Sequence, residues 1–150
     1  MKLGITSDHR GYKLKEQTIK ELLKRGYEVI DFGTDSEESV DYPDFAFILG
    51  ENVVKKRVDF GVAMCGSGAG MTIACNKVKG IRCANIVRKE VAETARNDDN
   101  INIVAIDENT SLEDAIDIIE TFIHTPFSTI ERYQRREKKI QRYEEANYVR

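Results

Sequence analysis

The sequence contains no long apolar run and no strong excess of charge of either sign. No stretch of the chain approaches the roughly 20 consecutive apolar residues of a membrane-spanning helix. Its start, already charged at Lys2, is unlike a secretory signal peptide. The net charge of −3 gives no general attraction for nucleic acid or for an anionic membrane. We therefore expect a cytoplasmic protein that has neither a membrane nor a nucleic acid as its partner.

Cysteine and histidine are also scarce. The three cysteines, Cys65, Cys75 and Cys83, are odd in number and their spacing matches no zinc motif. We therefore expect reduced thiols, no metal ion and no other cofactor. Of the two histidines, His124 lies at the end of an expected helix, where a capping role is sufficient.

Repeats, low-complexity stretches and linkers are absent too, and 150 residues suffice for one domain with its own core. Instead, short apolar segments alternate with segments of helical periodicity from the first residues on. The expected strands cover residues 2–6, 27–32, 60–64, 81–86 and 102–106. The expected helices cover residues 14–25, 43–57, 69–76, 89–96 and 110–123.

Five buried strands that alternate with helices imply a parallel sheet with helices on both faces. We expect a single α/β domain over residues 1–150, a three-layer α/β/α sandwich whose strand order one sequence does not reveal. Gly26 is expected to cap the first helix, and Thr110 with Glu113 to form a capping box. The charged segment 129–143 has helical composition but is too polar for the core. We expect it to pack across a second subunit or over the site.

The segment from Cys65 to Gly70 is the most informative part of the sequence. It follows the uncharged strand 60–64, and its glycines force a turn before the next helix. Such a turn directs backbone N–H groups into the space beyond the strand, where open α/β sheets bind anions and other ligands. A cysteine there is a better base and nucleophile than a free thiol. The plainer alternative is a buried structural cysteine on a tight turn.

The same turn excludes two nucleotide-binding motifs. A dinucleotide fingerprint needs a further glycine where Met71 stands, and a P-loop needs a Gly-Lys-Ser/Thr ending that is absent. We therefore expect a small anion or an oxyanion at the turn rather than a nucleotide.

Other polar groups lie at the ends of neighbouring strands. Asp8 and His9 follow the first strand, and because parallel strands end at one edge of a sheet, both side chains can converge on Cys65. The segment 97–100 precedes the fifth strand and is expected at the opposite edge. It reaches such a site more easily from a second subunit.

Arg132 and Arg136 are four residues apart, so a helix places both on one face, where they can clamp a phosphate. Their spacing alone favours a solvated charged face, because other charges crowd the segment. A basic helix can also touch nucleic acid, but the aromatic and base-reading features of such proteins are missing.

Several short segments, in this order along the chain, resemble the ribose/galactose isomerase family, which includes ribose-5-phosphate isomerase type B and the galactose-6-phosphate isomerase subunits. They are 7–11, 26–34, 40–44, 65–71, 76–78, 80–82 and 134–136. The resemblance reaches about Ile140, and the ordered set is far more specific than any one motif. It implies a flavodoxin-like sandwich that forms a homodimer or homotetramer, with active sites at the subunit interface. It also implies a metal-independent aldose–ketose isomerase acting through an enediolate, most directly on ribose 5-phosphate and ribulose 5-phosphate.

The resemblance further implies roles for individual residues, and it reverses the preference for a solvated face at the two arginines. Cys65 matches the family's base. Ser67, counted with it as catalytic, replaces the more usual threonine of an anion-binding turn and keeps a hydroxyl. The residues expected to bind substrate are Asp8, His9, Arg10, Gly66, Gly68, Ala69, Gly70, Asp99, Arg132 and Arg136.

Two positions depart from the family's pattern. Asp98 and Asp99 stand where most members carry His-Asn, and that histidine opens the sugar ring, so Asp98 becomes the candidate for this proton transfer. Asn109 replaces an arginine that contacts phosphate, and the charge of Arg10 is a candidate to compensate. These departures leave open a galactose-6-phosphate or other hexose- or tetrose-phosphate isomerase, a subunit that needs a partner, and a sugar-phosphate-binding module without turnover.

Overall fold

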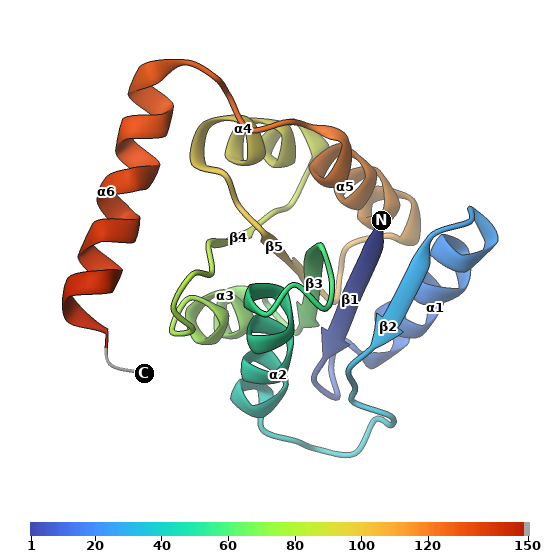
Figure 1. The fold of residues 1–150 in the computed structure, drawn as a ribbon. Helices are drawn as coiled ribbons and strands as arrows, with labels where there is room; N and C mark the ends of the chain where they lie inside the picture. The colour runs from blue at the N-terminus through green and yellow to red at the C-terminus, as the bar shows by residue number, and fades with distance from the viewer. Residues whose placement is uncertain (149–150) are drawn as a thin grey trace.

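The computed structural model describes residues 1–148, which form strands and helices in strict alternation up to one additional helix at the end (Figure 1). The strands are β1 (Lys2–Ser7), β2 (Glu28–Asp31), β3 (Phe60–Cys65), β4 (Cys83–Asn85) and β5 (Ile103–Asp107). The helices are α1 (Tyr12–Lys24), α2 (Tyr42–Val54), α3 (Ala69–Cys75), α4 (Lys89–Asp99), α5 (Leu112–His124) and α6 (Glu131–Asn147).

The strands form one sheet in the order β2-β1-β3-β5-β4, and every neighbouring pair is parallel. The predicted fold class, a five-stranded α/β sandwich of flavodoxin-like type, is confirmed. Its last two strands are exchanged relative to the common 2-1-3-4-5 order. Because the chain adds β2 on one side of β1 and β3 on the other, a switch point lies between β1 and β3. Open α/β sheets bind ligands at such a point, beyond the carboxyl ends of the strands.

Two apolar cores form because successive side chains of a buried strand point to opposite faces. On one face, residues such as Val62 and Met64 pack with α1, α4 and α5. On the other, Ala63 and Cys65 pack with α2 and α3. The second face is lined by small residues, and a Cβ added at Gly61 would come within 3.1 Å of the Leu49 side chain on α2. Helix α2 therefore lies close to the sheet. The side chain of Cys65 lies on the face of the sheet that α2 and α3 cover.

The two edge strands differ from the sequence-based prediction of five buried strands. No residue of β2 is fully buried, and β4 contains only three residues, of which Cys83 alone is buried. An edge strand has a neighbour on one side only, so the predicted segments 27–32 and 81–86 contribute fewer residues to the sheet than their composition indicates.

Helix ends show one correct cap and one error. Gly26 follows α1 with a φ of 91°, and the Tyr27 N–H donates to the carbonyl of Leu22, 3.1 Å away, as at a glycine-terminated helix. The capping box predicted at Thr110 is wrong by one residue. The Thr110 hydroxyl instead donates to Asp107 Oδ1 at 3.3 Å, so Ser111 caps α5.

Helix α6 stands to one side of the sandwich and contacts α4 (Figure 1). It occupies residues 131–147, where a helix over about 129–143 was predicted. In its own chain it does not lie over the glycine turn (Figure 1), and its packing across a second subunit stays a prediction. None of the helices within residues 1–148 is long and apolar enough to cross a membrane.

Candidate active site

The glycine turn after β3 directs a hydrogen-bond donor at a cysteine sulfur. Cys65 is the last residue of β3 and is only 4% exposed. Its Sγ accepts a hydrogen bond from the backbone N–H of Gly68, 3.2 Å away. Gly68 has a φ of 80°, and a Cβ there would lie 2.4 Å from Asn85 Oδ1, so glycine is required. Because an N–H donor stabilises negative charge on sulfur, this geometry favours a reactive Cys65 over an inert packing residue.

Side chains from other segments close over the turn. A Cβ at Gly66 would lie 2.5–2.7 Å from the Arg10 guanidinium, and one at Gly70 would lie 2.9–3.1 Å from the Tyr42 ring. The Ser67 Oγ is exposed and accepts from the Ala69 N–H at 3.2 Å, so its own O–H remains a donor. The result is a small, polar surface around Cys65.

The loop after β1 is fixed against the end of β3. Asp8 is 6% exposed, and its Oδ1 accepts from the backbone N–H groups of Arg10 (2.9 Å) and Gly11 (3.0 Å). The Asp8 N–H donates to the carbonyl of Met64 at 3.2 Å. A Cβ at Gly11 would lie 2.5 Å from the same carbonyl oxygen. This close approach places Asp8 beside the glycine turn.

His9 is oriented by the loop that precedes α2. Its Nδ1 accepts a hydrogen bond from the Val40 N–H, 3.2 Å away. Since an accepting Nδ1 carries no proton, the ring's proton is on Nε2, which is thereby available to donate to a ligand. The side chain is half-buried, as expected for a group that faces both protein and ligand.

Arg10 brings a positive charge to the turn. Its NH2 lies 2.5 Å from Glu108 Oε1, in the loop after β5. The hydrogen bond and charge of Glu108 raise the pKa of Arg10, and the charges of Asp8 and Cys65 add to this effect. The guanidinium is more than half exposed, so it can exchange Glu108 for an anionic ligand.

The other two cysteines have a different environment. Cys75 is fully buried, Cys83 is 8% exposed, and Cys75 Sγ lies 3.8 Å from the carbonyl oxygen of Ala46. The neighbouring Cys75 and burial together raise the pKa of the Cys83 thiol well above its usual range. A thiol that keeps its proton does not act as a base, which argues against Cys83 in that role. Cys65 differs from both other cysteines because its sulfur accepts the Gly68 N–H of the glycine turn.

The remaining predicted site residues do not reach this surface within one chain. Cys65 pairs in register with Asp107 at the carboxyl end of β5, whereas Asp98 and Asp99 form the last turn of α4, before β5 begins. They therefore lie at the opposite edge of the sheet, as their sequence position predicts. The helix continues past the predicted end at residue 96 until Asn100, whose φ of 54° closes it.

Arg132 and Arg136 lie on α6, away from Cys65, and both guanidinium groups pack over the Tyr133 ring, 4.6 and 5.8 Å from its centre. Both side chains are exposed. Within residues 1–148, no group of three or more His, Cys, Asp or Glu side chains is placed to hold a metal ion.

Sequence reasoning assigned no role to three residues that shape this surface. Tyr42 covers Gly70, Asn85 packs against Gly68 and donates to the carbonyl of Ser67 at 3.1 Å, and Glu108 pairs with Arg10. Tyr42 lies in one of the family-like segments, and this was the available signal. Asn85 and Glu108 sit at strand ends without a distinctive motif, and only the folded chain brings them to the turn.

Comparison with known proteins identifies the family of the chain. The Ribose/Galactose Isomerase family matches residues 3–140. The structure of ribose-5-phosphate isomerase B from Clostridium thermocellum has 44% sequence identity and a TM-score of 0.93, covering 97% of this chain and 99% of that one. Ribose-5-phosphate isomerase B of Mycolicibacterium paratuberculosis is 35% identical over 149 residues, 98% of this chain and 94% of the relative.

A further similar structure contains a sugar phosphate. It is ribose-5-phosphate isomerase B from Mycoplasma genitalium with bound ribulose 5-phosphate, with 36% identity, a TM-score of 0.89 and coverage of 96% of each chain. The predicted family and the predicted class of enzyme, an aldose–ketose isomerase, are thus confirmed. The chain belongs to the Ribose/Galactose Isomerase family.

Proposed function

We propose that the protein interconverts ribose 5-phosphate and ribulose 5-phosphate in the cytoplasm, with Cys65 as the base. The observation that carries this proposal is the Gly68 N–H directed at Cys65 Sγ, 3.2 Å away, at the switch point of the sheet. The relatives named above are ribose-5-phosphate isomerases, and they are similar over nearly the whole chain.

The proton transfers balance without a cofactor. The Cys65 thiolate takes the proton from C2 of the open-chain aldose, and the electrons move onto the C1 oxygen to give an enediolate. The resulting thiol returns the proton to C1, while the O2 hydroxyl proton passes to O1 as C2 becomes the carbonyl. The Gly68 and Ala69 N–H groups already donate to Cys65 and Ser67, so the remaining backbone N–H groups of the turn are the proposed donors to the oxyanion, together with the Ser67 O–H.

Asp8 and His9 are the proposed ligands of the sugar hydroxyls. The Asp8 carboxylate is held by two backbone N–H groups, and the His9 Nε2–H is free to donate because Nδ1 already accepts from Val40. Arg10 adds a positive charge at the turn. It pairs there with Glu108, the residue before the uncharged Asn109. These groups hold the reacting carbons in place while Cys65 moves the proton.

The phosphate group requires a second copy of the chain. Arg132 and Arg136 lie on α6, and Asp98 and Asp99 lie at the far edge of the sheet, so none of the four serves the Cys65 of its own chain. We propose a homodimer, or a homotetramer built from it, in which these residues complete the partner's site. Sedimentation at micromolar concentration tests this point, and a fully active compact monomer would contradict it.

Ring opening is the slowest step of the proposed reaction. Asp98 occupies the position of the family's ring-opening histidine, and its Oδ1 accepts from Asn97 Nδ2 at 2.7 Å. At neutral pH an imidazole exchanges protons more readily than a carboxylate. We infer that turnover of ribose 5-phosphate is limited by opening of its furanose ring.

The deciding experiment is a substrate panel. The purified protein, with a chelator present, is assayed with ribose 5-phosphate, galactose 6-phosphate and erythrose 4-phosphate. We expect ribulose 5-phosphate to form from the pentose, with competitive inhibition by inorganic phosphate. Turnover of the hexose phosphate alone would replace the proposed substrate. Binding of phosphate without turnover of any sugar would make the chain a binding module.

A further inference from the structure

Helix α6 is held to its own chain by polar contacts rather than by apolar packing. Of its seventeen residues, all of them described, only Glu137 and Glu144 are buried, at 6% and 7% exposure. They are seven residues apart and therefore lie on one face of the helix. The apolar side chains of Ile140 and Tyr143 are instead 49% and 66% exposed. Two buried carboxylates on an otherwise solvated helix indicate specific partners.

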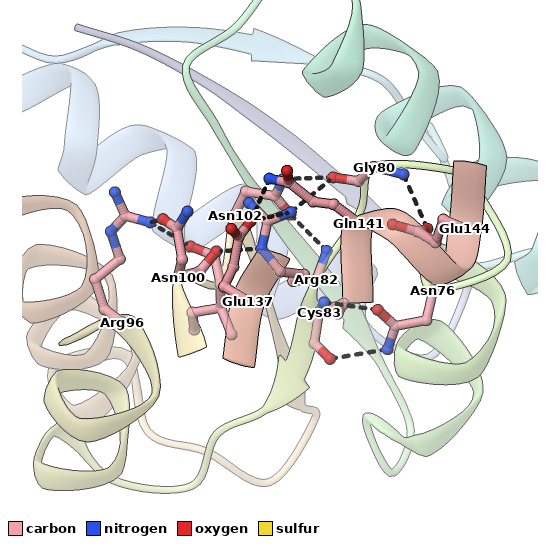
Figure 2. A network of polar contacts seen from close by, with 11 residues as sticks. Asn76, Gly80, Arg82, Cys83, Arg96, Asn100, Asn102, Glu137, Gln141 and Glu144 are labelled. Carbon is pink, nitrogen blue, oxygen red and sulfur yellow. Dashed lines mark hydrogen bonds and ion pairs between the residues drawn. The ribbon is translucent and has the colours of Figure 1, made fainter. Parts of the chain in front are cut away.

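Those partners lie in the turn before β4 (Figure 2). Arg82 NH1 lies 3.4 Å from Glu137 Oε1, and Glu144 Oε2 accepts from the Gly80 N–H at 3.1 Å. Gln141, one helical turn after Glu137, donates to Glu137 Oε1 at 2.6 Å. Three side chains of α6 thus form one polar seam with residues 80–82.

Arg82 is itself held by hydrogen bonds to the segment that precedes β5. Its Nε donates to the carbonyl of Asn100 at 2.7 Å, and its backbone N–H donates to Asn102 Oδ1 at 2.8 Å. Asn102 Nδ2 donates in turn to the carbonyl of Gly80, 2.9 Å away. Because its backbone N–H and its Nε both have partners, Arg82 is held where its guanidinium meets Glu137.

The Arg82–Glu137 pair is charge-dependent. The Arg82 side chain is only 16% exposed, and burial lowers its pKa, while the charges of Glu137 and Glu144 act in the opposite direction. Removing the Glu137 carboxylate leaves the buried Arg82 cation with only the charge of Glu144 nearby, which is costlier than losing an exposed ion pair. Glu137 therefore stabilises α6 in the position in which Glu137 and Arg82 are paired.

A second joint connects the start of α6 to the end of α4. The Ser128 N–H donates to the carbonyl of Asn97 at 3.0 Å, and Gln134 Nε2 donates to the carbonyl of Ser128 at 3.1 Å. Asn97 immediately precedes Asp98. The end of α4, the turn at Arg82 and α6 consequently form one connected unit, and this unit carries every proposed site residue that Cys65 of the same chain does not reach.

We propose that Glu137, acting through Arg82, is a positioning residue that sets the place of the Arg132–Arg136 pair and hence the affinity of the partner's site for the phosphate group. The inference rests on the proposed function. It assigns no chemistry to Glu137, which faces its own chain while Arg136, its neighbour in sequence, is exposed.

Glu137→Gln tests the proposal because it removes the charge and keeps the size of the side chain. We expect KM for the sugar phosphate and the inhibition constant of inorganic phosphate to rise together about tenfold. The value of kcat should change by less than about twofold. Glu145→Gln makes the same charge change at an exposed position of α6 and should leave both constants unchanged.

Two further measurements separate positioning from general damage. In a background that carries both Arg132→Ala and Arg136→Ala, Glu137→Gln should add little, because the groups it positions are gone. An equal effect in both backgrounds would overturn the proposal. Amide hydrogen exchange over residues 131–147 should be faster in Glu137→Gln than in Glu145→Gln. Unchanged exchange with unchanged phosphate affinity would also overturn it. If the native protein converted no sugar phosphate, the proposed function would fail, and exchange and phosphate affinity would still decide this inference.

Discussion

The glycine turn after β3 and helix α6 provide the two halves of the proposed site, and different forces hold them in place. The turn is formed by neighbours in sequence, and a backbone N–H of the turn itself, that of Gly68, makes the contact to Cys65 Sγ. Helix α6 is positioned by side chains from distant segments, such as Arg82 and Glu137. Backbone geometry leaves the turn little conformational freedom, whereas a single substitution can break a seam of side-chain contacts. Variants of the turn should therefore affect the chemical step, and variants of α6 should affect binding.

The largest effect is expected at Cys65. Cys65→Ala removes the proposed base, so kcat should fall by about 1,000-fold while phosphate binding persists. Cys75→Ala is the matched control, since Cys75 lies in the core, and it should retain most of the activity. Steady-state kinetics with both proteins measure the difference. Near-normal turnover in Cys65→Ala would remove the sulfur from the mechanism.

The same contrast is accessible to thiol alkylation. The pKa of Cys83 is raised by burial and by Cys75, so its thiol stays protonated through neutral pH and loses its proton only at higher pH. Iodoacetamide near neutral pH should label Cys65 first, and inorganic phosphate or substrate should slow this labelling. Faster labelling of Cys83 would contradict the assignment.

A slightly smaller loss is expected when the turn itself is distorted. Gly68→Ala places a Cβ 2.4 Å from Asn85 Oδ1 and forces a left-handed φ on alanine, which moves the N–H away from Cys65. We expect kcat to fall about 100-fold with a much smaller change in KM. The double variant Gly68→Ala/Asn85→Ala relieves the contact but not the φ, so it should recover only part of the loss. Full recovery would show that crowding by Asn85 is the whole cause.

Variants of the arginine pair should have the opposite kinetic signature. Arg136→Ala and Arg132→Ala each remove a charged contact to phosphate, so KM should rise about thirtyfold, and kcat should fall less. Arg135→Ala is a suitable control, because Arg135 lies on the same helix and pairs with Glu131. Unchanged phosphate inhibition in both pair variants would make this face of α6 a solvated surface.

The smallest effect, and the most selective one, is expected at Asp98. Asp98→His restores an imidazole at the proposed ring-opening position, and turnover of ribose 5-phosphate should rise about tenfold. Erythrose 4-phosphate forms no stable furanose with its terminal hydroxyl esterified, so its turnover should change little. Comparing the two substrates isolates ring opening from proton transfer at carbon. A native enzyme already fast on ribose 5-phosphate and slowed by Asp98→Asn would show that the carboxylate performs this step.

The sequence predicted what depends on neighbouring residues. The uncharged strand 60–64 and the glycines after it identify the turn, because burial and a forced turn are encoded within a dozen positions. The strand order was not predictable, since it depends on which side of β3 each crossover closes. The cap of α5 was missed for a local reason, because the hydroxyl of Thr110 is taken by Asp107.

The seam of α6 was beyond sequence reasoning for a physical reason. The segment 129–143 has the composition of a solvated helix. Nothing in the neighbouring sequence distinguishes Glu137 from an exposed glutamate such as Glu145. The distinction comes from Arg82, which reaches Glu137 only when β4 and α6 are already in place. Charged pairs between distant segments become visible only in the folded chain.

The separation of Cys65 from Arg136 within one chain has a consequence for inheritance. In the proposed dimer each site takes its sulfur from one copy and its phosphate clamp from the other. A Cys65→Ala chain paired with an Arg136→Ala chain then contains one doubly damaged site and one intact site. An allele without the base and an allele with weakened phosphate binding should therefore complement each other in the same cell.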